Sequence, residues 1–243
     1  MAKKIDSTAL DRLVNDLRAA HGENLESVVL YGSAAAGDHV ELRSDHNLLI
    51  VLNRITSDDL RLAQAPMRRW QSLGQPIPVY FTVQELQDAA DVFPIEFLQM
   101  EKARRVLYGG DPFEFVQISR ANLRHQTEYE LRTKLIRLRR LYIPASISVK
   151  KLSALMSDSL ASFAALFRAV LILMEQEPPI FKADCVRAIV RLLRLEAAPF
   201  ERILELRVGE GSALKETEAN SVFTEYMAQI ERIIETVDRI QSN

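Results

Sequence analysis

Short apolar runs alternate with helical patterns over the first half of the chain. Four runs rich in Val, Ile, Leu or Tyr have the length and composition of buried strands: Ser27–Tyr31, Asn47–Leu52, Ile77–Phe81 and Val106–Tyr108. Helical spacing of apolar residues follows Ser7, the capping patterns Thr56-x-x-Asp59 and Thr82-x-x-Glu85, and Pro94. This alternation predicts a small mixed sheet with helices.

After about residue 115 the pattern changes to long helical stripes. The first contains Leu131, Leu135, Leu138 and Tyr142, and the last contains Phe223, Met227, Ile230, Ile234 and Val237. Proline and glycine residues separate the stripes, and long helices with short connections form antiparallel bundles. We therefore predict an α+β protein, with an α/β domain over residues 1–115 followed by an all-α helical bundle over residues 116–243.

Composition places the chain among ordinary globular proteins, with 48% hydrophobic and 26% charged residues. No apolar stretch approaches the roughly 20 residues that span a bilayer. The charged N-terminus lacks the apolar core of a signal peptide. A single cysteine, Cys185, excludes an internal disulfide framework and a Cys-rich zinc site. We expect a cytoplasmic protein without a membrane partner.

The net charge of −2 is divided unevenly. Residues 1–115 hold 12 Lys/Arg and 17 Asp/Glu, which gives −5, and residues 116–243 hold 19 and 16, which gives +3. Nucleic-acid binding usually needs a strongly basic surface, so this small asymmetry argues against it. It does indicate two halves of different character.

Polar residues gather between the first two apolar runs, in the segment from Leu30 to Leu52. Gly32-Ser33 follows the first run, and Ser44-Asp45-His46-Asn47 leads into the second. Glycine permits the backbone conformation of a phosphate-binding turn, and a serine there offers a hydroxyl and an N–H to a phosphate. Because strand side chains alternate, Asp45 and Asn47 share one face and His46 points to the other, where we expect it to pack in the core.

This segment resembles the signature of the DNA polymerase beta-like nucleotidyltransferase superfamily, a Gly-Ser pair followed by Asp-x-Asp. The helical half is similar to the bundle that small bacterial two-domain nucleotidyltransferases append to that core, and residues 93–113 resemble their junction. The resemblance implies a short mixed sheet with helices packed on one side. Here the pair reads Asp45-His46-Asn47, so the second carboxylate has become an amide.

The resemblance also implies roles for these residues. Gly32, Ser33 and Ser44 would bind the phosphates of a nucleoside triphosphate, and Asp45 and Asn47 would be the catalytic Mg²⁺ ligands. An amide ligates Mg²⁺ weakly, so we expect weak binding of the ion. The family's third carboxylate is expected near Ile77–Phe81, a segment without an acid. The metal carboxylate set is therefore incomplete.

A basic run lies on the first helix of the predicted bundle. A solvated helix face is its ordinary interpretation; the functional one is that Arg132 and Arg139, which share a helix face, bind the triphosphate. Two functions follow: transfer of a nucleoside monophosphate to a hydroxyl of a small molecule or protein, or a catalytically degenerate nucleotide-binding regulator or interaction module. The sequence leaves the acceptor and a possible homo-oligomer open.

Overall fold

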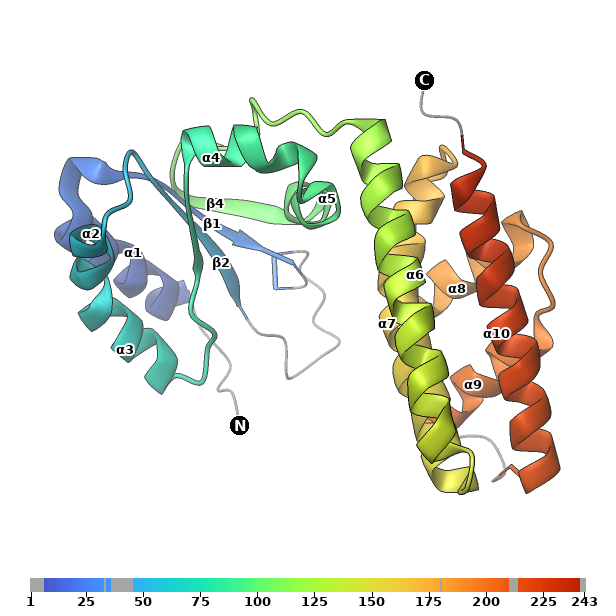
Figure 1. The fold of residues 1–243 in the computed structure, drawn as a ribbon. Coiled ribbons are helices and arrows are strands. Elements are labelled where there is room, and N and C mark those ends of the chain that lie inside the picture. Colours follow the sequence, from blue (N-terminus) through green and yellow to red (C-terminus); the bar gives the residue numbers. More distant parts are fainter. Residues whose placement is uncertain (1–6, 33, 36–45, 180, 210–213, 241–243) are drawn as a thin grey trace. The chain divides into compact units, whose positions relative to one another are not determined.

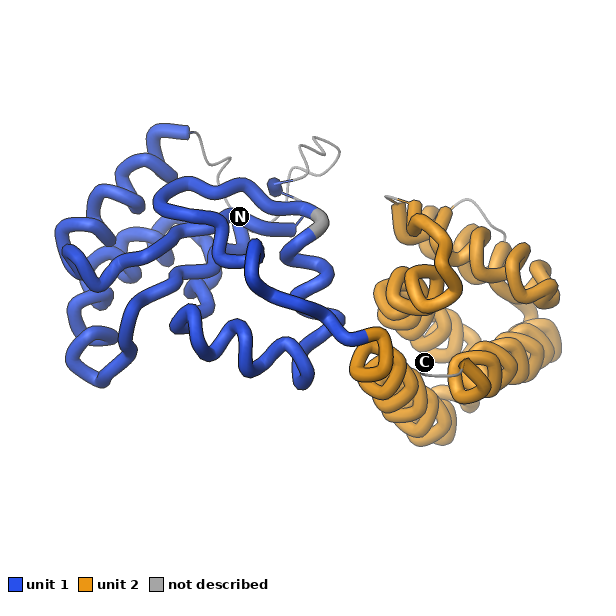
Figure 2. The backbone as a smooth tube through the Cα atoms, turned by 90° about the horizontal axis from the view of Figure 1, so that it is seen from above, with its two compact units in different colours: residues 1–119 blue, residues 120–243 orange. Residues whose placement is uncertain are grey.

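The structure, a computed structural model (Figure 1), describes residues 7–32, 34–35, 46–179, 181–209 and 214–240 of the chain. The chain divides into two compact units, Met1–Ser119 and Arg120–Asn243 (Figure 2). A four-stranded mixed sheet with helices forms the described part of unit 1, and helices alone form that of unit 2. The predicted α+β fold class is thus confirmed.

Unit 1 contains strands, helices and two short 3₁₀ turns. In chain order these are α1 (Ser7–His21), η1 (Gly22–Asn24), β1 (Leu25–Tyr31), β2 (Asn47–Leu52), α2 (Ser57–Leu62), α3 (Gln64–Ser72), β3 (Val79–Thr82), α4 (Val83–Asp88), η2 (Ala89–Asp91), α5 (Pro94–Lys102) and β4 (Arg104–Gly109). The strands lie within two residues of their predicted bounds. Both predicted capping boxes form, with the hydroxyls of Thr56 and Thr82 accepting the N–H groups of Asp59 and Glu85.

The sheet has the strand order β3-β2-β1-β4. β1 is antiparallel to β2 and to β4, whereas β2 and β3 run parallel. In this order β1 and β2 are central, which explains why their apolar runs are nearly continuous: both faces of each strand are buried. The two edge strands are β3 and β4.

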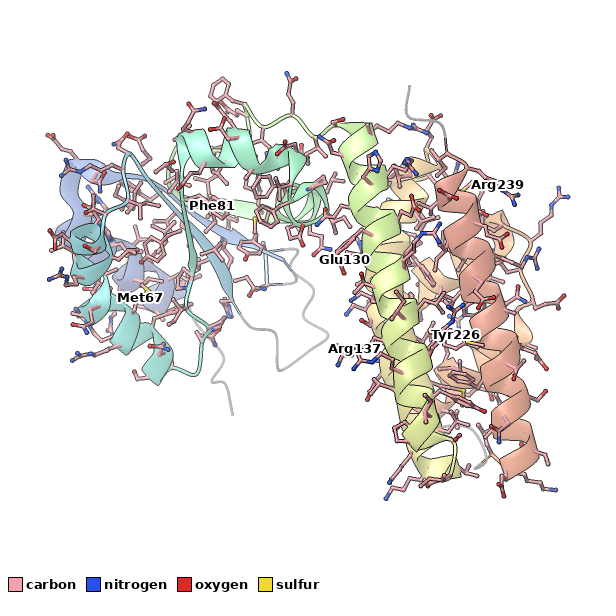
Figure 3. The ribbon with its side chains drawn as sticks, viewed as in Figure 1. Met67, Phe81, Glu130, Arg137, Tyr226 and Arg239 are labelled. Carbon is pink, nitrogen blue, oxygen red and sulfur yellow. The ribbon has the colours of Figure 1, made fainter. Side chains whose placement is uncertain are left out.

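Helices cover both faces of this sheet, which corrects the expectation of helices on one side (Figure 1). On one face α1 and α3 pack against alternate strand residues, with Leu17, Ile50 and Trp70 in the core. On the other face α4 and α5 contribute Leu86 and Phe97 to a second core. Figure 3 shows the side chain of Met67, which belongs to the core on the face covered by α1 and α3. The strands bury apolar residues on both faces because each face carries its own helices.

One buried polar side chain stands out in the first core. His21, at the end of α1, is 7% exposed, and neither ring nitrogen has a hydrogen-bond partner within the described residues. Its ring lies 6.4 Å from that of Tyr80. Burial lowers the pKa of His21, and the nearby Asp59 carboxylate offsets only part of this effect. The imidazole is therefore neutral at neutral pH.

The chain leaves the sheet at a close approach between β4 and β1. Gly109 has a φ of +78°, and a Cβ added there would lie 1.8 Å from the carbonyl oxygen of Glu26. Beside it the Ser27 hydroxyl, which is buried, donates to the carbonyl oxygens of Tyr108 (3.1 Å) and Gly110 (2.8 Å). Only glycine fits this position, so the exit of the chain from β4 is fixed by backbone contact.

Unit 2 is a helical bundle. Its helices are α6 (Arg120–Ala145), α7 (Val149–Leu173), α8 (Lys182–Leu192), α9 (Ala198–Val208) and α10 (Glu216–Asp238). α7 contacts each of the other four and buries Phe163 and Phe167. The predicted stripe of α6 is buried at Leu131, Leu135 and Leu138. Cys185 is buried, as predicted, and its thiol donates to the carbonyl of Pro179.

α7 is long and apolar enough to cross a membrane by length and composition, with a mean hydropathy of 1.6 over its best window. This differs from the expectation that no stretch approaches such a length. Half of that window is buried inside the protein, where α7 is the central helix of unit 2. Its apolar composition is accounted for by contacts with four neighbouring helices.

Candidate functional site

The glycine turn closes the end of β1. Gly32 has a φ of +81°, its N–H donates to the carbonyl of Ala103, and its carbonyl accepts the N–H of Ala35, both at 2.9 Å. A Cβ added to Gly32 would meet the Nδ2 atom of Asn47 at 3.4 Å. Glycine is required by the backbone conformation. The turn therefore lies directly against the first residue of β2.

A row of polar side chains crosses the sheet beside this turn. Tyr31 pairs with Asn47 on β2 and with Arg104 on β4. Residues directly opposite each other in antiparallel strands project to the same face, so the amide, phenol and guanidinium share one face. Burial raises the pKa of Tyr31, which keeps the phenol neutral. Of this row, only Asn47 is predicted from the sequence, because Tyr31 and Arg104 join it through strand pairing.

Arg104 is held in place by Asp111, which lies just beyond β4. The Arg104 Nε atom is 3.1 Å from Oδ1 and 2.9 Å from Oδ2 of Asp111, and Nη2 is 2.7 Å from Oδ2. The guanidinium also donates to the carbonyl of Glu101 and lies over the ring of Phe113, 5.4 Å from its centroid. Burial raises the pKa of the Asp111 carboxyl, but the bonds from Arg104 and from the Phe113 N–H outweigh it and lower the pKa. The pair fixes the cation at the end of the polar row.

Three of the predicted site residues, Ser33, Ser44 and Asp45, lie outside the described residues. Their roles stay predictions. Gly32 and Asn47 are described, and they come together as the preceding contacts show.

No acid lies on β3, the strand where the third carboxylate is expected. In the parallel register Leu49 pairs with Val79, so the face of β2 that bears Asn47 continues onto Val79. The nearest acid along the chain is Glu85, which accepts the Thr82 N–H at 2.7 Å and so caps α4. Among the described residues no group of three or more His, Cys, Asp or Glu could hold a metal ion. The described donors do not fit a two-ion magnesium site, because an amide offers no charge and the neighbouring strand offers no acid.

His46 lies on the opposite face, as expected. Its ring stands perpendicular to that of Trp70, with the centroids 6.4 Å apart. The backbone N–H of His46 donates to the Oε1 atom of Gln75 at 2.8 Å. Trp70 belongs to the core between the sheet and α1–α3. The expectation of core packing for His46 is confirmed.

The two predicted arginines of α6 are held by carboxylates of unit 2. Arg132 Nε lies 2.7 Å from Glu128 Oε1, and its Nη2 lies 3.5 Å from Asp238 of α10. Arg139 Nη2 lies 2.6 Å from Glu231, also on α10. A nucleotide that used either arginine would have to compete with these carboxylates. Their role in nucleotide binding stays a prediction.

Another cation on α6 has no such competitor. Arg137 is exposed and forms no ion pair within the described part of unit 2. Figure 3 shows Arg137 and Glu130 on the side of α6 that faces away from α10. The sequence alone could not separate Arg137 from Arg139, because the carboxylate that pairs with Arg139 belongs to α10, far along the chain.

The structure of this chain is similar to a solved structure of another protein, and this similarity concerns the fold. The structure is similar to the crystal structure of spectinomycin adenyltransferase AAD(9) from Enterococcus faecialis with ATP and spectinomycin. The TM-score is 0.60 and the sequence identity 14%, and the match covers 95% of this chain and 100% of that chain. No protein-family model and no curated protein matches the sequence. The two proteins share a fold at low sequence identity.

Proposed function

We propose, from a fold shared with an ATP-using adenyltransferase, that this chain binds a nucleoside triphosphate at the Gly32 turn and transfers a nucleoside monophosphate to a hydroxyl. The acceptor hydroxyl belongs to a small molecule or a protein. Gly32, Ser33 and Ser44 would contact the phosphates. Asp45 and Asn47 would complete the site on the strand beside them.

One observation supports this proposal above the others: the glycine turn lies against Asn47. A Cβ at residue 32 would come 3.4 Å from the Asn47 amide, although 15 positions separate the two residues along the chain. The two parts of the motif are thus adjacent at one end of the sheet. A turn with a positive-φ glycine lets a phosphate approach the backbone closely.

In the proposed transfer the acceptor oxygen forms a bond to the α-phosphorus, and the bond from that phosphorus to the bridging oxygen breaks. Pyrophosphate leaves with the electron pair, and the hydroxyl proton passes to water. The described residues do not fit the family's two-ion arrangement, so no step is assigned to a metal. Arg104 and Tyr31 border the turn and bring a cation and a neutral phenol to the same face of the sheet.

A second candidate is a nucleotide-binding regulator that performs no transfer. The sequence of β3 favours the regulator. Val79 lies on the same face of the sheet as Asn47, where an acid is expected, and Glu85 caps α4 instead. The two candidates share the nucleotide site and differ only in chemistry.

Nucleotide binding is tested by a matched pair of glycine variants. Gly32 and Gly22 both have positive φ, +81° and +55°, so alanine strains either backbone. Gly22 lies before β1, at the end of the strand opposite the turn, and a Cβ there meets nothing within 4 Å. We expect ATP to raise the melting temperature of the wild type and of Gly22→Ala, by mass action, but not that of Gly32→Ala. Equal responses of the two variants would contradict the site.

Transfer is tested separately with α-³²P-labelled ATP and Mg²⁺, with spectinomycin or the protein itself as acceptor. Asn47→Asp restores a carboxylate at the second motif position and should strengthen Mg²⁺ binding measured by calorimetry. If the wild type labels an acceptor, the transferase is supported, whereas label from Asn47→Asp alone would show that the asparagine has removed the activity. ATP binding without label in either protein supports the regulator.

A further inference from the structure

β3 leaves one edge of the sheet open. It pairs with β2 alone among the described strands, so the alternate N–H and C=O groups of Val79–Thr82 point away from the sheet. Thr82 N–H is already used by the Glu85 carboxylate. Pro78 precedes the strand directly and cannot donate a hydrogen bond. The open edge is therefore short, and can pair with only a few residues of another chain.

A groove follows this edge. Its volume is about 490 Å³, and it is lined by both Tyr80 and Phe81. Consecutive strand residues project to opposite faces, and these two indeed belong to the two different cores of unit 1. A groove lined by both residues therefore lies at the edge of β3. Its other lining residues come from the elements on either face of the sheet, which form its walls.

The two walls differ in chemistry. On the side of Tyr80 the wall is apolar, with Ile55 and with Leu60 of α2, the latter 45% exposed. On the side of Phe81 the wall is formed by Glu85 and Asp88 of α4 with Ala89 and Val92. The two carboxylates also accept hydrogen bonds, from the Thr82 N–H and from the Gln84 side chain. Among the described residues, no Lys or Arg lines the groove. The groove thus has an apolar side and an acidic side.

We propose that this groove binds an extended, basic peptide segment of a partner protein, which adds to β3 as a fifth strand. Strand side chains alternate, so an added strand directs every second residue toward Leu60 and the others toward Glu85 and Asp88. Its complement is a sequence in which apolar residues alternate with Lys or Arg. Main-chain bonds to β3 give affinity, and the two walls select the side chains.

Charge favours this occupant over a second copy of the chain. A second copy would bring another acidic wall, because Glu85 and Asp88 repeat in it, whereas a basic segment complements these carboxylates. The groove is a surface of unit 1 distinct from the Gly32 turn, and the proposal does not depend on nucleotide binding.

The probe is a fluorescein-labelled, end-blocked octapeptide that alternates lysine with valine and leucine, titrated with the full chain and followed by fluorescence anisotropy. Two control peptides are used. In the first, glutamate replaces each lysine; in the second, alternate backbone nitrogens on the pairing side are methylated. Asp88→Lys reverses a charge in the groove. Asp11→Lys makes the same charge change on an exposed position of α1 and is its matched control. Unchanged Trp70 fluorescence confirms that each variant is folded.

We expect saturable binding that Asp88→Lys weakens about tenfold and Asp11→Lys leaves unchanged, with both control peptides failing to bind. No saturation up to about 1 mM of the full chain would overturn the proposal. Equal losses for the two aspartate variants would show a general charge effect, and full binding of the methylated peptide would exclude strand addition. Sedimentation that reveals a dimer abolished by Asp88→Lys would assign the groove to a second copy instead.

Discussion

Removal of the Asp111 carboxylate should destabilise unit 1 far more than removal of an exposed partner of an ion pair. Asp111 accepts three contacts from Arg104 between 2.7 and 3.1 Å and a fourth from the Phe113 N–H at 3.0 Å. The side chains of the pair are 23% and 24% exposed. Within the part of the chain that the structure describes, Asp111→Ala leaves the guanidinium beside Phe113 with the Glu101 carbonyl as its remaining hydrogen-bond partner.

The magnitude follows from this geometry. A hydrogen bond to a charged group contributes about 1.5–3 kcal/mol, and an unpaired buried charge costs about 3–5 kcal/mol. Because about a quarter of each side chain is in water, the lower end applies, and we expect a loss of about 3 kcal/mol in the free energy of unfolding. Asp58 pairs with Arg61 at 3.1 Å, but these side chains are 83% and 76% exposed. Asp58→Ala should cost less than about 0.5 kcal/mol.

Trp70 makes the measurement specific to unit 1. It is the single tryptophan of the chain, lies in unit 1 and is 2% exposed. Its fluorescence in urea therefore reports the unfolding of unit 1 even if unit 2 unfolds separately, which would otherwise invalidate a two-state analysis. Wild type, Asp111→Ala and Asp58→Ala are compared at one temperature and ionic strength.

The pH dependence of unfolding is a second test of the Asp111–Arg104 pair. The pKa of the Asp111 carboxyl is lower in the folded chain than its ordinary value of 3.8. Its stabilisation is therefore complete above that value and is lost as the pH falls through the folded pKa. The gap between wild type and Asp111→Ala should be full at neutral pH and shrink below about pH 4. A cost no greater than that of Asp58→Ala, or a gap that does not change with pH, would refute this account of the pair.

Two further predictions concern titration and the bundle. The pKa of His21 is lowered from 6.5, so the stability of unit 1 should fall as the pH drops below 6.5 through the folded pKa. His21→Leu should flatten this pH dependence in unfolding followed by Trp70 fluorescence. An unchanged slope would contradict the assignment. Arg132→Ala or Arg139→Ala should weaken ATP binding more than AMP binding, by about 1.5–3 kcal/mol for each lost contact. Glu231→Ala, which frees Arg139 from its ion pair, is the control, and equal losses for ATP and AMP would assign the arginines to bundle stability.

The strands of unit 1 and the glycine turn at Gly32 could be predicted because their signals are local. The bounds of β2, Asn47–Leu52, follow from one uninterrupted apolar run, and the alternation along it correctly separates His46 from Asn47. The Gly32 turn follows from the residue type that its positive φ requires. Each of these inferences uses only residues near one another in the chain.

The remaining features depend on pairing across the fold. Arg104 joins the polar row only because β4 pairs with β1 in a register that also contains an irregularity between Val28 and Val29. The carboxylate that holds Arg139 lies 92 residues away, on α10. Neither helix periodicity nor residue spacing contains this information, since register and helix packing are set by tertiary contacts. The groove likewise follows from strand order, which leaves β3 at an edge.

The anchoring of Asp111 also determines how unit 1 resists a mechanical pull on the segment that leads to Arg120. β4 is an edge strand, and an edge strand loaded at its end peels away one hydrogen bond at a time. Here the load first meets the buried ring of Phe113 and the bidentate pair between Asp111 and Arg104. Because Asp111 lies after β4 and Arg104 is its first residue, their ion pair connects the two ends of the strand. The segment between the units is thus a tether fixed by side chains, and the β1–β4 ladder is loaded only after they yield.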